Sequence, residues 1–138
     1  MTALLDTSFL FALTDKSDRN HRRVLNVIQT IDEPLILVTV VLPEICYLIA
    51  SRLGHGVMRA FLTELFNSNI KLEPISSTEL ARINEILVDY ADSHLDFVDA
   101  AIVAIAERKN ITRILTLDRR DFSIIRPRHC PYFELLPS

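Results

Sequence analysis

The sequence predicts an α/β protein, a three-layer α/β/α sandwich with a mainly parallel central sheet. Short apolar runs alternate with stretches whose apolar residues recur at helical spacing, which is typical of parallel strands joined by right-handed helical crossovers. The length of 138 residues fits a single domain, and 49% hydrophobic against 24% charged residues suits a chain with a buried core. We therefore expect one domain over residues 1–138.

The first half of the chain is expected to form three strands and four helices. Asp6, Thr7 and Ser8 are helix-cap residue types that follow the first apolar run. Both glycines lie in Gly54-His55-Gly56, which divides two helices of a helical hairpin. The expected strands are residues 3–5, 35–38 and 70–75, the last broken by Pro74, and the expected helices are 9–13, 18–31, one carrying Val41, Glu44 and Ile49, and 57–66.

The second half adds two helices, two strands and a charged turn. Residues 96–109 are expected to form the most buried helix, because apolar residues cover its whole circumference. In a helix over residues 76–90, the side chains expected to face the core are Leu80, Ile83, Leu87 and Tyr90. The remaining elements are a strand over 111–117, a turn at Arg119-Arg120-Asp121, a tail with Pro127 and Pro131, and an edge strand over 132–136.

Asp99 is the strongest indication of a functional site. It is the only polar residue between Phe97 and Ala106, and a buried carboxylate is costly unless a cation meets it. Asp96 is expected to cap this helix, with Ser93 or Asp96 beginning a capping box. Asp99 would then be the third-position acid of that box, but such an acid usually faces solvent. The segment therefore favours a cation site at Asp99.

Three further acids lie in or beside apolar segments. Asp6 and Asp118 follow strands, whereas Glu44, like Asp99, lies near a helix start. All four would converge at the carboxyl edge of the sheet, where like charges repel unless a cation binds. Oxygen ligands without His or Cys indicate Mg²⁺ or Mn²⁺. The four dispersed histidines are expected on the solvated surface: His21, His55, His94 and His129.

Each acid also has an ordinary structural explanation. Asp6 could cap a helix, and Asp118 could be a turn residue, with Asp121 competing for any functional role. Glu44 near a helix start would favour the helix dipole by about 0.5 kcal/mol. The joint pattern of acids is what favours a metal site over these separate explanations.

Composition narrows the setting of the protein. The formal net charge of -3 argues against coating nucleic acid by bulk electrostatics, but a local cluster of Arg and Lys beside a metal would still admit a phosphodiester. No apolar stretch reaches the roughly 18 residues of a membrane span, and the first residues lack the features of a signal peptide. Cys46 and Cys130 suggest neither a zinc motif nor a disulfide framework. We expect a cytoplasmic protein without membrane contact.

Four segments together resemble the PIN domain, and specifically the toxin ribonucleases of bacterial VapBC toxin-antitoxin pairs. They are Leu4–Ser8, Pro43–Glu44, Phe97–Ala104 and Leu115–Phe122, and the resemblance covers essentially the whole chain. It implies a PIN-like α/β/α fold and a metal-dependent ribonuclease whose acids correspond to Asp6, Glu44, Asp99 and Asp118. It also implies that Ser8 and Thr116 help to orient metal or water, with Asp96 as a further supporting residue and Asp118 or Asp121 as the fourth acid.

The resemblance further implies a homodimer and a cognate antitoxin that blocks the active site. The helix over residues 57–66 has apolar surface for such contacts, although core packing explains the same residues equally well. These residues are Met58, Phe61, Leu62 and Phe66.

These observations lead to the hypothesis of an endoribonuclease that uses one or two Mg²⁺ or Mn²⁺ ions to hydrolyse RNA phosphodiesters. The candidates for holding flanking phosphates, each alternatively an ordinary surface charge, are Arg52, Arg59, Arg119 and Arg120. An alternative is a non-catalytic module of the same fold that binds RNA or protein. A phosphotransferase is a weaker alternative, because no second acid lies two residues after Asp6.

Overall fold

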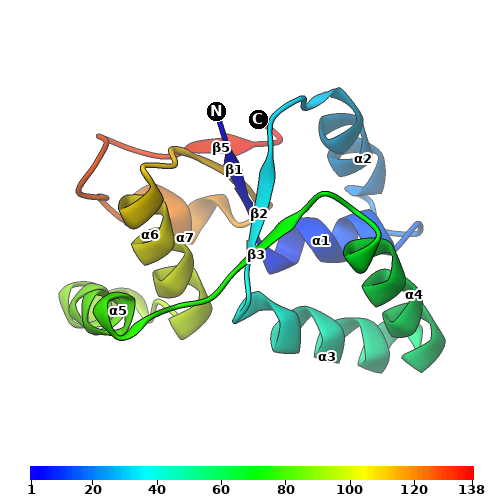
Figure 1. Ribbon diagram of the computed structural model, residues 1–138, viewed down its shortest axis with the longest axis horizontal. Coiled ribbons are helices and arrows are strands. Elements are labelled where there is room, and N and C mark those ends of the chain that lie inside the picture. Colours follow the sequence, from blue (N-terminus) through cyan, green and yellow to red (C-terminus); the bar gives the residue numbers. More distant parts are fainter.

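A five-stranded sheet forms the centre of the protein in the computed structural model, which describes residues 1–138 (Figure 1). All four strand pairings are parallel, and the order across the sheet is β3-β2-β1-β4-β5. The strands are β1 (Ala3–Leu5), β2 (Leu35–Val38), β3 (Lys71–Glu73), β4 (Arg113–Leu115) and β5 (Glu134–Leu136).

Helices cover both faces of this sheet. In Figure 1, α1 to α4 lie on one side of the strands and α5 to α7 on the other, so the predicted three-layer sandwich is confirmed. The helices are α1 (Thr7–Thr14), α2 (His21–Thr30), α3 (Val41–Leu53), α4 (His55–Phe66), α5 (Ser77–Asp89), α6 (Phe97–Lys109) and α7 (Arg119–Ile124), with a short 3₁₀ helix at Ala91–Ser93.

The α6 helix is the most buried, as predicted. Every residue from Asp99 to Ala106 is buried, because the helix packs against the sheet on one side and α5 on the other. Asn110 ends the helix in the left-handed conformation with φ of 57°, which Asn tolerates better than most residues. This packing holds Asp99 in the first turn of a rigid element.

Two local predictions were wrong. Arg119 to Asp121 do not form a turn but begin α7, because the carboxylate of Asp118 accepts a hydrogen bond from the Asp121 N–H at 3.2 Å and caps the helix. Leu80 does not face the core but is 52% exposed, and Ile83 and Ile86 form the buried face of α5.

Two histidines also differ from the expectation of free surface residues. The Nδ1 of His21 lies 2.9 Å from the Ala12 carbonyl, and the Nε2 of His129 lies 2.6 Å from the Ile111 carbonyl. Both rings are half-buried. The first joins the start of α2 to α1, and the second joins the segment after α7 to the segment before β4. They therefore have structural partners.

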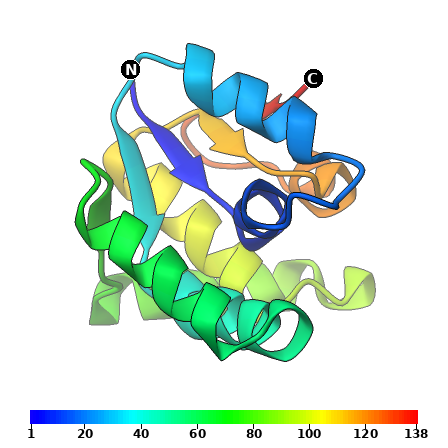
Figure 2. The ribbon, with the colours of Figure 1, turned by 90° about the vertical axis from the view of Figure 1, so that its right-hand side faces the viewer.

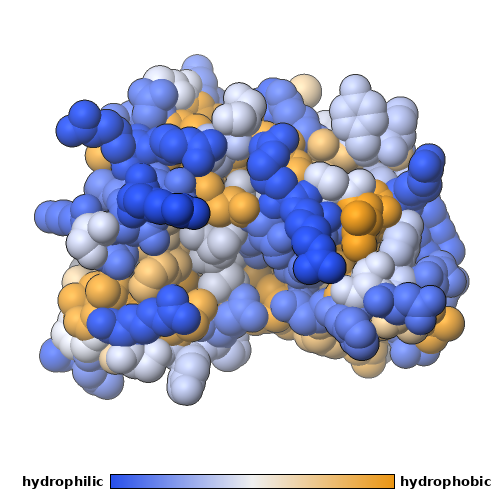
Figure 3. All heavy atoms as spheres, turned by 180° about the vertical axis from the view of Figure 1, so that it is seen from behind, coloured by the Kyte–Doolittle hydropathy of each residue, from blue (hydrophilic) through white to orange (hydrophobic).

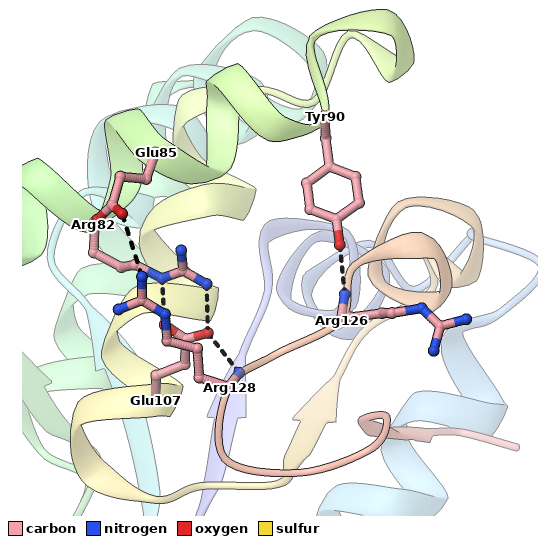
Figure 4. A network of polar contacts seen from close by, with 6 residues as sticks. All are labelled: Arg82, Glu85, Tyr90, Glu107, Arg126 and Arg128. Atoms are coloured by element: carbon pink, nitrogen blue, oxygen red, sulfur yellow. Dashed lines mark hydrogen bonds and ion pairs between the residues drawn. The ribbon is translucent and has the colours of Figure 1, made fainter.

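A polar network fastens the segment after α7 to α5 and α6 (Figure 4). Arg82 forms two hydrogen bonds with Glu107, at 2.7 and 3.0 Å, and the Arg128 N–H donates to the same carboxylate at 2.9 Å. The Arg128 guanidinium also reaches Glu85 at 3.2 Å. These arginines are therefore committed to carboxylates of the protein itself.

The topology fixes where a ligand site can lie. The chain crosses over one face of the sheet after β1 and over the other after β4, and these two strands are neighbours. Open parallel sheets bind ligands at the carboxyl ends of strands where the direction of winding reverses. Asp6 follows β1 and Asp118 follows β4 at that position.

No helix of the protein combines the length and apolar composition that crossing a membrane requires.

Candidate metal centre

Asp6 is held rigidly at the end of β1. Its side chain is buried, with 4% of the residue exposed, and its backbone N–H donates to the Leu115 carbonyl at 3.0 Å. The Oδ2 atom of Asp6 accepts hydrogen bonds from Ser8 Oγ at 2.8 Å and from Thr116 Oγ1 at 2.7 Å. The structure therefore brings both predicted hydroxyl residues onto the first predicted acid.

The two hydroxyls also fix the turn after β4. Ser8 Oγ accepts the Leu117 N–H at 2.9 Å, and Thr116 Oγ1 accepts the Asp118 N–H at 2.9 Å. Each hydroxyl thus donates to Asp6 and accepts from the segment that carries Asp118. The spacing of Asp6 relative to Asp118 is set by these bonds, which no sequence pattern revealed.

Three acids from two elements form a compact group beside this turn. Carboxylate oxygens of Asp99, Asp118 and Asp121 all lie within 4.8 Å of one another. Asp99 comes from the first turn of α6, and the other two come from the cap and first turn of α7. Both candidates for the fourth acid are therefore present in the group. Asp96 caps α6 by accepting the Asp99 N–H at 2.8 Å, and so acts on Asp99 through the backbone.

The acids of this pocket disfavour one another's charge. Burial raises the pKa of Asp99 to about 9, with further contributions from Asp96, Asp6, Asp118 and Asp121. Burial also raises the pKa of Asp6, against the hydrogen bonds from Thr116 and Ser8, which lower it. Burial and then the neighbouring Asp121 raise the pKa of Asp118, which the charge of Arg120 opposes.

No Lys or Arg forms an ion pair with Asp6, Asp99, Asp118 or Asp121, although other acids of the protein do have such partners. The donor set consists of carboxylate and hydroxyl oxygens, without His or Cys, and it fits a hard divalent cation such as Mg²⁺ or Mn²⁺. Such an ion would remove the repulsion that raises these pKa values.

Glu44 stands apart from this group. It lies half-buried in the first turn of α3, and α3 begins at the carboxyl end of β2, at the same edge of the sheet as the other acids. It does not belong to the group within 4.8 Å. Its role as an acid of the site remains a prediction.

The predicted phosphate-binding arginines have different surroundings. The Arg119 guanidinium donates to the carbonyls of Leu135 at 3.3 Å and Pro137 at 3.0 Å. Arg52 stacks over the Phe11 ring at 5.5 Å, and Arg59 Nε donates to His55. Arg120 alone acts on the pocket, through Asp118.

Comparison with known proteins identifies the family of this chain. Residues 3–126 match the PIN domain family. The chain belongs to the PIN domain family. Ribonuclease VapC26 of Mycobacterium tuberculosis (strain ATCC 25618 / H37Rv) is 34% identical over 134 residues, which are 97% of this chain and 99% of that protein.

Solved structures share this PIN fold. VapC20 of Mycobacterium tuberculosis, a sarcin-ricin loop cleaving toxin, superposes with a TM-score of 0.80 at 23% identity over 86% of this chain and 91% of that one. VapBC2 from Rickettsia felis, bound to a DNA fragment from its promoter, gives a TM-score of 0.73 at 16% identity, covering 98% of both chains. These likenesses support the PIN assignment at the level of fold.

Replacing Thr116 with Val tests the hydroxyl link to Asp6. We expect the pKa of Asp6 to rise further, because the variant loses a hydrogen bond that stabilises the carboxylate. The Asp118 N–H also loses its partner, so the free energy of unfolding should fall by about 1–3 kcal/mol. Carboxyl NMR titration and urea denaturation measure the two effects. The half-buried Thr112 has no side-chain hydrogen bond, so Thr112→Val is the control, and equal behaviour of both variants would contradict the link.

Proposed function

We propose that this PIN protein is a metal-dependent endoribonuclease. The observation that carries the proposal is the close group of Asp99, Asp118 and Asp121 beside the buried Asp6. No Lys or Arg forms an ion pair with these acids, and the pKa values of Asp6, Asp99 and Asp118 are raised. The relative Ribonuclease VapC26 supports RNA as the substrate. The residues proposed to hold Mg²⁺ or Mn²⁺ are Asp6, Asp99, Asp118 and Asp121, with Glu44 as a further candidate.

The residues around the ion have separate roles in this proposal. A bound divalent ion lowers the pKa of water and stabilises negative charge on a phosphodiester. Ser8 and Thr116 keep Asp6 in one orientation, and Asp96 fixes the first turn of α6 that carries Asp99. Glu44 is the candidate for orienting the attacking water, because it lies at the same edge of the sheet but outside the compact acid group.

The same proposal includes a toxin-antitoxin setting, with a cognate antitoxin and a homodimer as partners. A toxin-antitoxin complex from Klebsiella pneumoniae superposes with a TM-score of 0.67 at 21% identity, covering 96% of this chain and 99% of that one. The α4 helix contains no buried residue, and its Phe66 is 74% exposed. Figure 3 shows apolar side chains gathered at the end of the molecule that holds α3 and α4. An exposed apolar surface of this kind is typical of a site that binds a protein partner.

Cleavage of total RNA with Mg²⁺, Mn²⁺ or EDTA tests the proposed function. We expect discrete fragments with either metal and intact RNA in EDTA, because the acid group needs the ion to act. Fragment ends mapped by primer extension would show a limited set of sites for an endonuclease. Equal cleavage in EDTA would contradict metal dependence, and intact RNA under every condition would favour the non-catalytic alternative.

A further inference from the structure

The cations of this protein fall into two groups. Of the fifteen Lys and Arg residues, six form ion pairs with carboxylates, and these lie on β3, α5, the end of α6, β4 and the segment after α7. They are Lys71, Arg82, Arg108, Lys109, Arg113 and Arg128. The other nine have no such partner.

Two of the unpaired cations contact the last residues of the chain, and each has an unpaired arginine beside it in the sequence. The Arg119 guanidinium lies 3.0 Å from the Pro137 carbonyl, and the Arg23 guanidinium lies 3.3 Å from the adjoining Ser138 carbonyl. Arg22 precedes Arg23 in the first turn of α2, and Arg120 follows Arg119 in α7. We call these four residues the arginine cluster.

The arginine cluster adjoins the acid pocket. Arg119 and Arg120 come directly after Asp118, and the charge of Arg120 lowers the pKa of that carboxyl. In Figure 2 the blue loop that leads into α2 lies on the same side of the molecule as the orange α7, beyond the ends of β1 and β4. The rear face in Figure 3 shows strongly hydrophilic side chains over the α2 and α7 regions. The cluster and the acid pocket therefore lie at the same edge of the sheet.

No Asp or Glu side chain forms an ion pair with the arginine cluster. Residues 19–31 contain three arginines and no acid. In the preceding loop, Asp15 accepts hydrogen bonds from Ser17, and Asp18 accepts the Asn20 N–H. Glu134 of β5 is paired with Arg113. Arg22 and Arg120 make no side-chain hydrogen bond in the protein. Arg23 binds Asn20 and Ser138 and Arg119 binds two carbonyls, but each guanidinium keeps further N–H donors for an external anion.

We propose that the arginine cluster binds the phosphate backbone of the RNA strand on the α7 side of the acid pocket, with Arg22 and Arg23 as contacts beyond those that the sequence suggested. This inference rests on the proposed function, which places the scissile phosphate at the acids. A chain of phosphates needs unpaired cations at successive positions, and Arg suits phosphate because its planar group donates two parallel hydrogen bonds. The hydrogen bonds from Arg119 to the Leu135 and Pro137 carbonyls hold its guanidinium beside the end of β5.

The test measures binding of a fluorescent single-stranded RNA by anisotropy over a range of KCl concentrations, in the Asp99→Asn background so that the RNA stays intact. We expect Arg22→Gln/Arg23→Gln to weaken binding about tenfold at low salt. The slope of log K against log salt should fall by about 0.7 for each phosphate that the variant no longer binds. Arg22→Gln alone guards against misfolding, because Arg22 is exposed and makes no hydrogen bond that the fold requires.

Arg128→Gln is the matched control, because this arginine is exposed but paired with Glu85. It should bind RNA like the parent protein. An unchanged dissociation constant and salt slope in the double variant would overturn the proposal. So would a loss of binding to a polyglutamate peptide with RNA binding intact, since that would assign the cluster to an acidic protein partner.

Cleavage assays separate this inference from the proposed function. If Arg22→Gln/Arg23→Gln in an otherwise native protein cleaves RNA with unchanged kcat/KM and binds it normally, the proposed role of the arginine cluster is wrong but the proposed nuclease activity is not. If the native protein never cleaves RNA but the double variant still loses RNA affinity, the proposed nuclease activity is wrong but RNA binding by the arginine cluster is supported.

Discussion

Asp99→Asn is expected to lower RNA cleavage about 100-fold or more while leaving the fold intact. Asn keeps the shape of the side chain but lacks the charge that the proposed ion requires, and interactions of this kind contribute two or more orders of magnitude. Asp99 belongs to the compact acid group and is only 6% exposed. A water molecule therefore cannot readily take the place of its carboxylate. Initial rates on a defined RNA in Mn²⁺, with circular dichroism to verify folding, measure the effect.

Asp92→Asn is the matched control for this variant. Asp92 is exposed in the 3₁₀ helix between α5 and α6 and lies outside the acid group. Its rate should equal that of the native protein. Native-like cleavage by a folded Asp99→Asn protein would contradict the assignment of Asp99.

The stability of the metal-free protein is expected to fall as the pH rises. The pKa of Asp99 is raised to about 9 by burial and by the neighbouring acids, whereas the unfolded carboxyl keeps its ordinary value of 3.8. Between these values the folded state binds more protons than the unfolded state, so each step up in pH favours unfolding. We expect the free energy of unfolding in EDTA to be lower at pH 8 than at pH 5.5 by about 2 kcal/mol or more.

Urea denaturation at the two pH values measures this loss. Asp99→Asn should flatten the dependence, because the variant has no carboxyl there to ionise. Saturating Mn²⁺ should restore stability at pH 8 by about 3 kcal/mol at a hundred times its dissociation constant. A metal-free native protein that is equally stable at both pH values would show that burial and the neighbouring acids do not raise the pKa of Asp99 as described.

The architecture could be predicted from the sequence because its signals are local. The apolar runs of the strands and the apolar circumference of α6 predicted the parallel sheet and the burial of Asp99, both confirmed. The prediction that Leu80 faces the core was wrong because helical spacing defines the buried face only to within one residue. The buried face of α5 contains Ile83 and Ile86 instead. The α7 helix was missed because it is short and its first residues are charged, which is also typical of a turn. Its cap is a single local hydrogen bond from the Asp121 N–H to the Asp118 carboxylate.

The site was less accessible to sequence reasoning than the fold. That Asp118 and Asp121 both join Asp99 depends on the cap of α7, and the hydroxyl link from Ser8 and Thr116 to Asp6 joins residues 110 positions apart. The separation of Glu44 from the compact group is likewise a matter of how α3 is placed on the sheet. The arginines of α2 could have been recognised from the sequence. Residues 19–31 contain three arginines and no acid at i+3 or i+4 that could pair with them.

Calorimetric titration of the metal-free protein with Mn²⁺ tests most directly whether the acids form one cation site. The native protein should bind one or two ions at pH 7.5 with release of protons, because the pKa of Asp99, raised to about 9, leaves that carboxyl protonated before the metal arrives. Asp99→Asn should bind Mn²⁺ at least about tenfold more weakly. Absence of binding to the native protein, or equal binding by both proteins, would contradict the site.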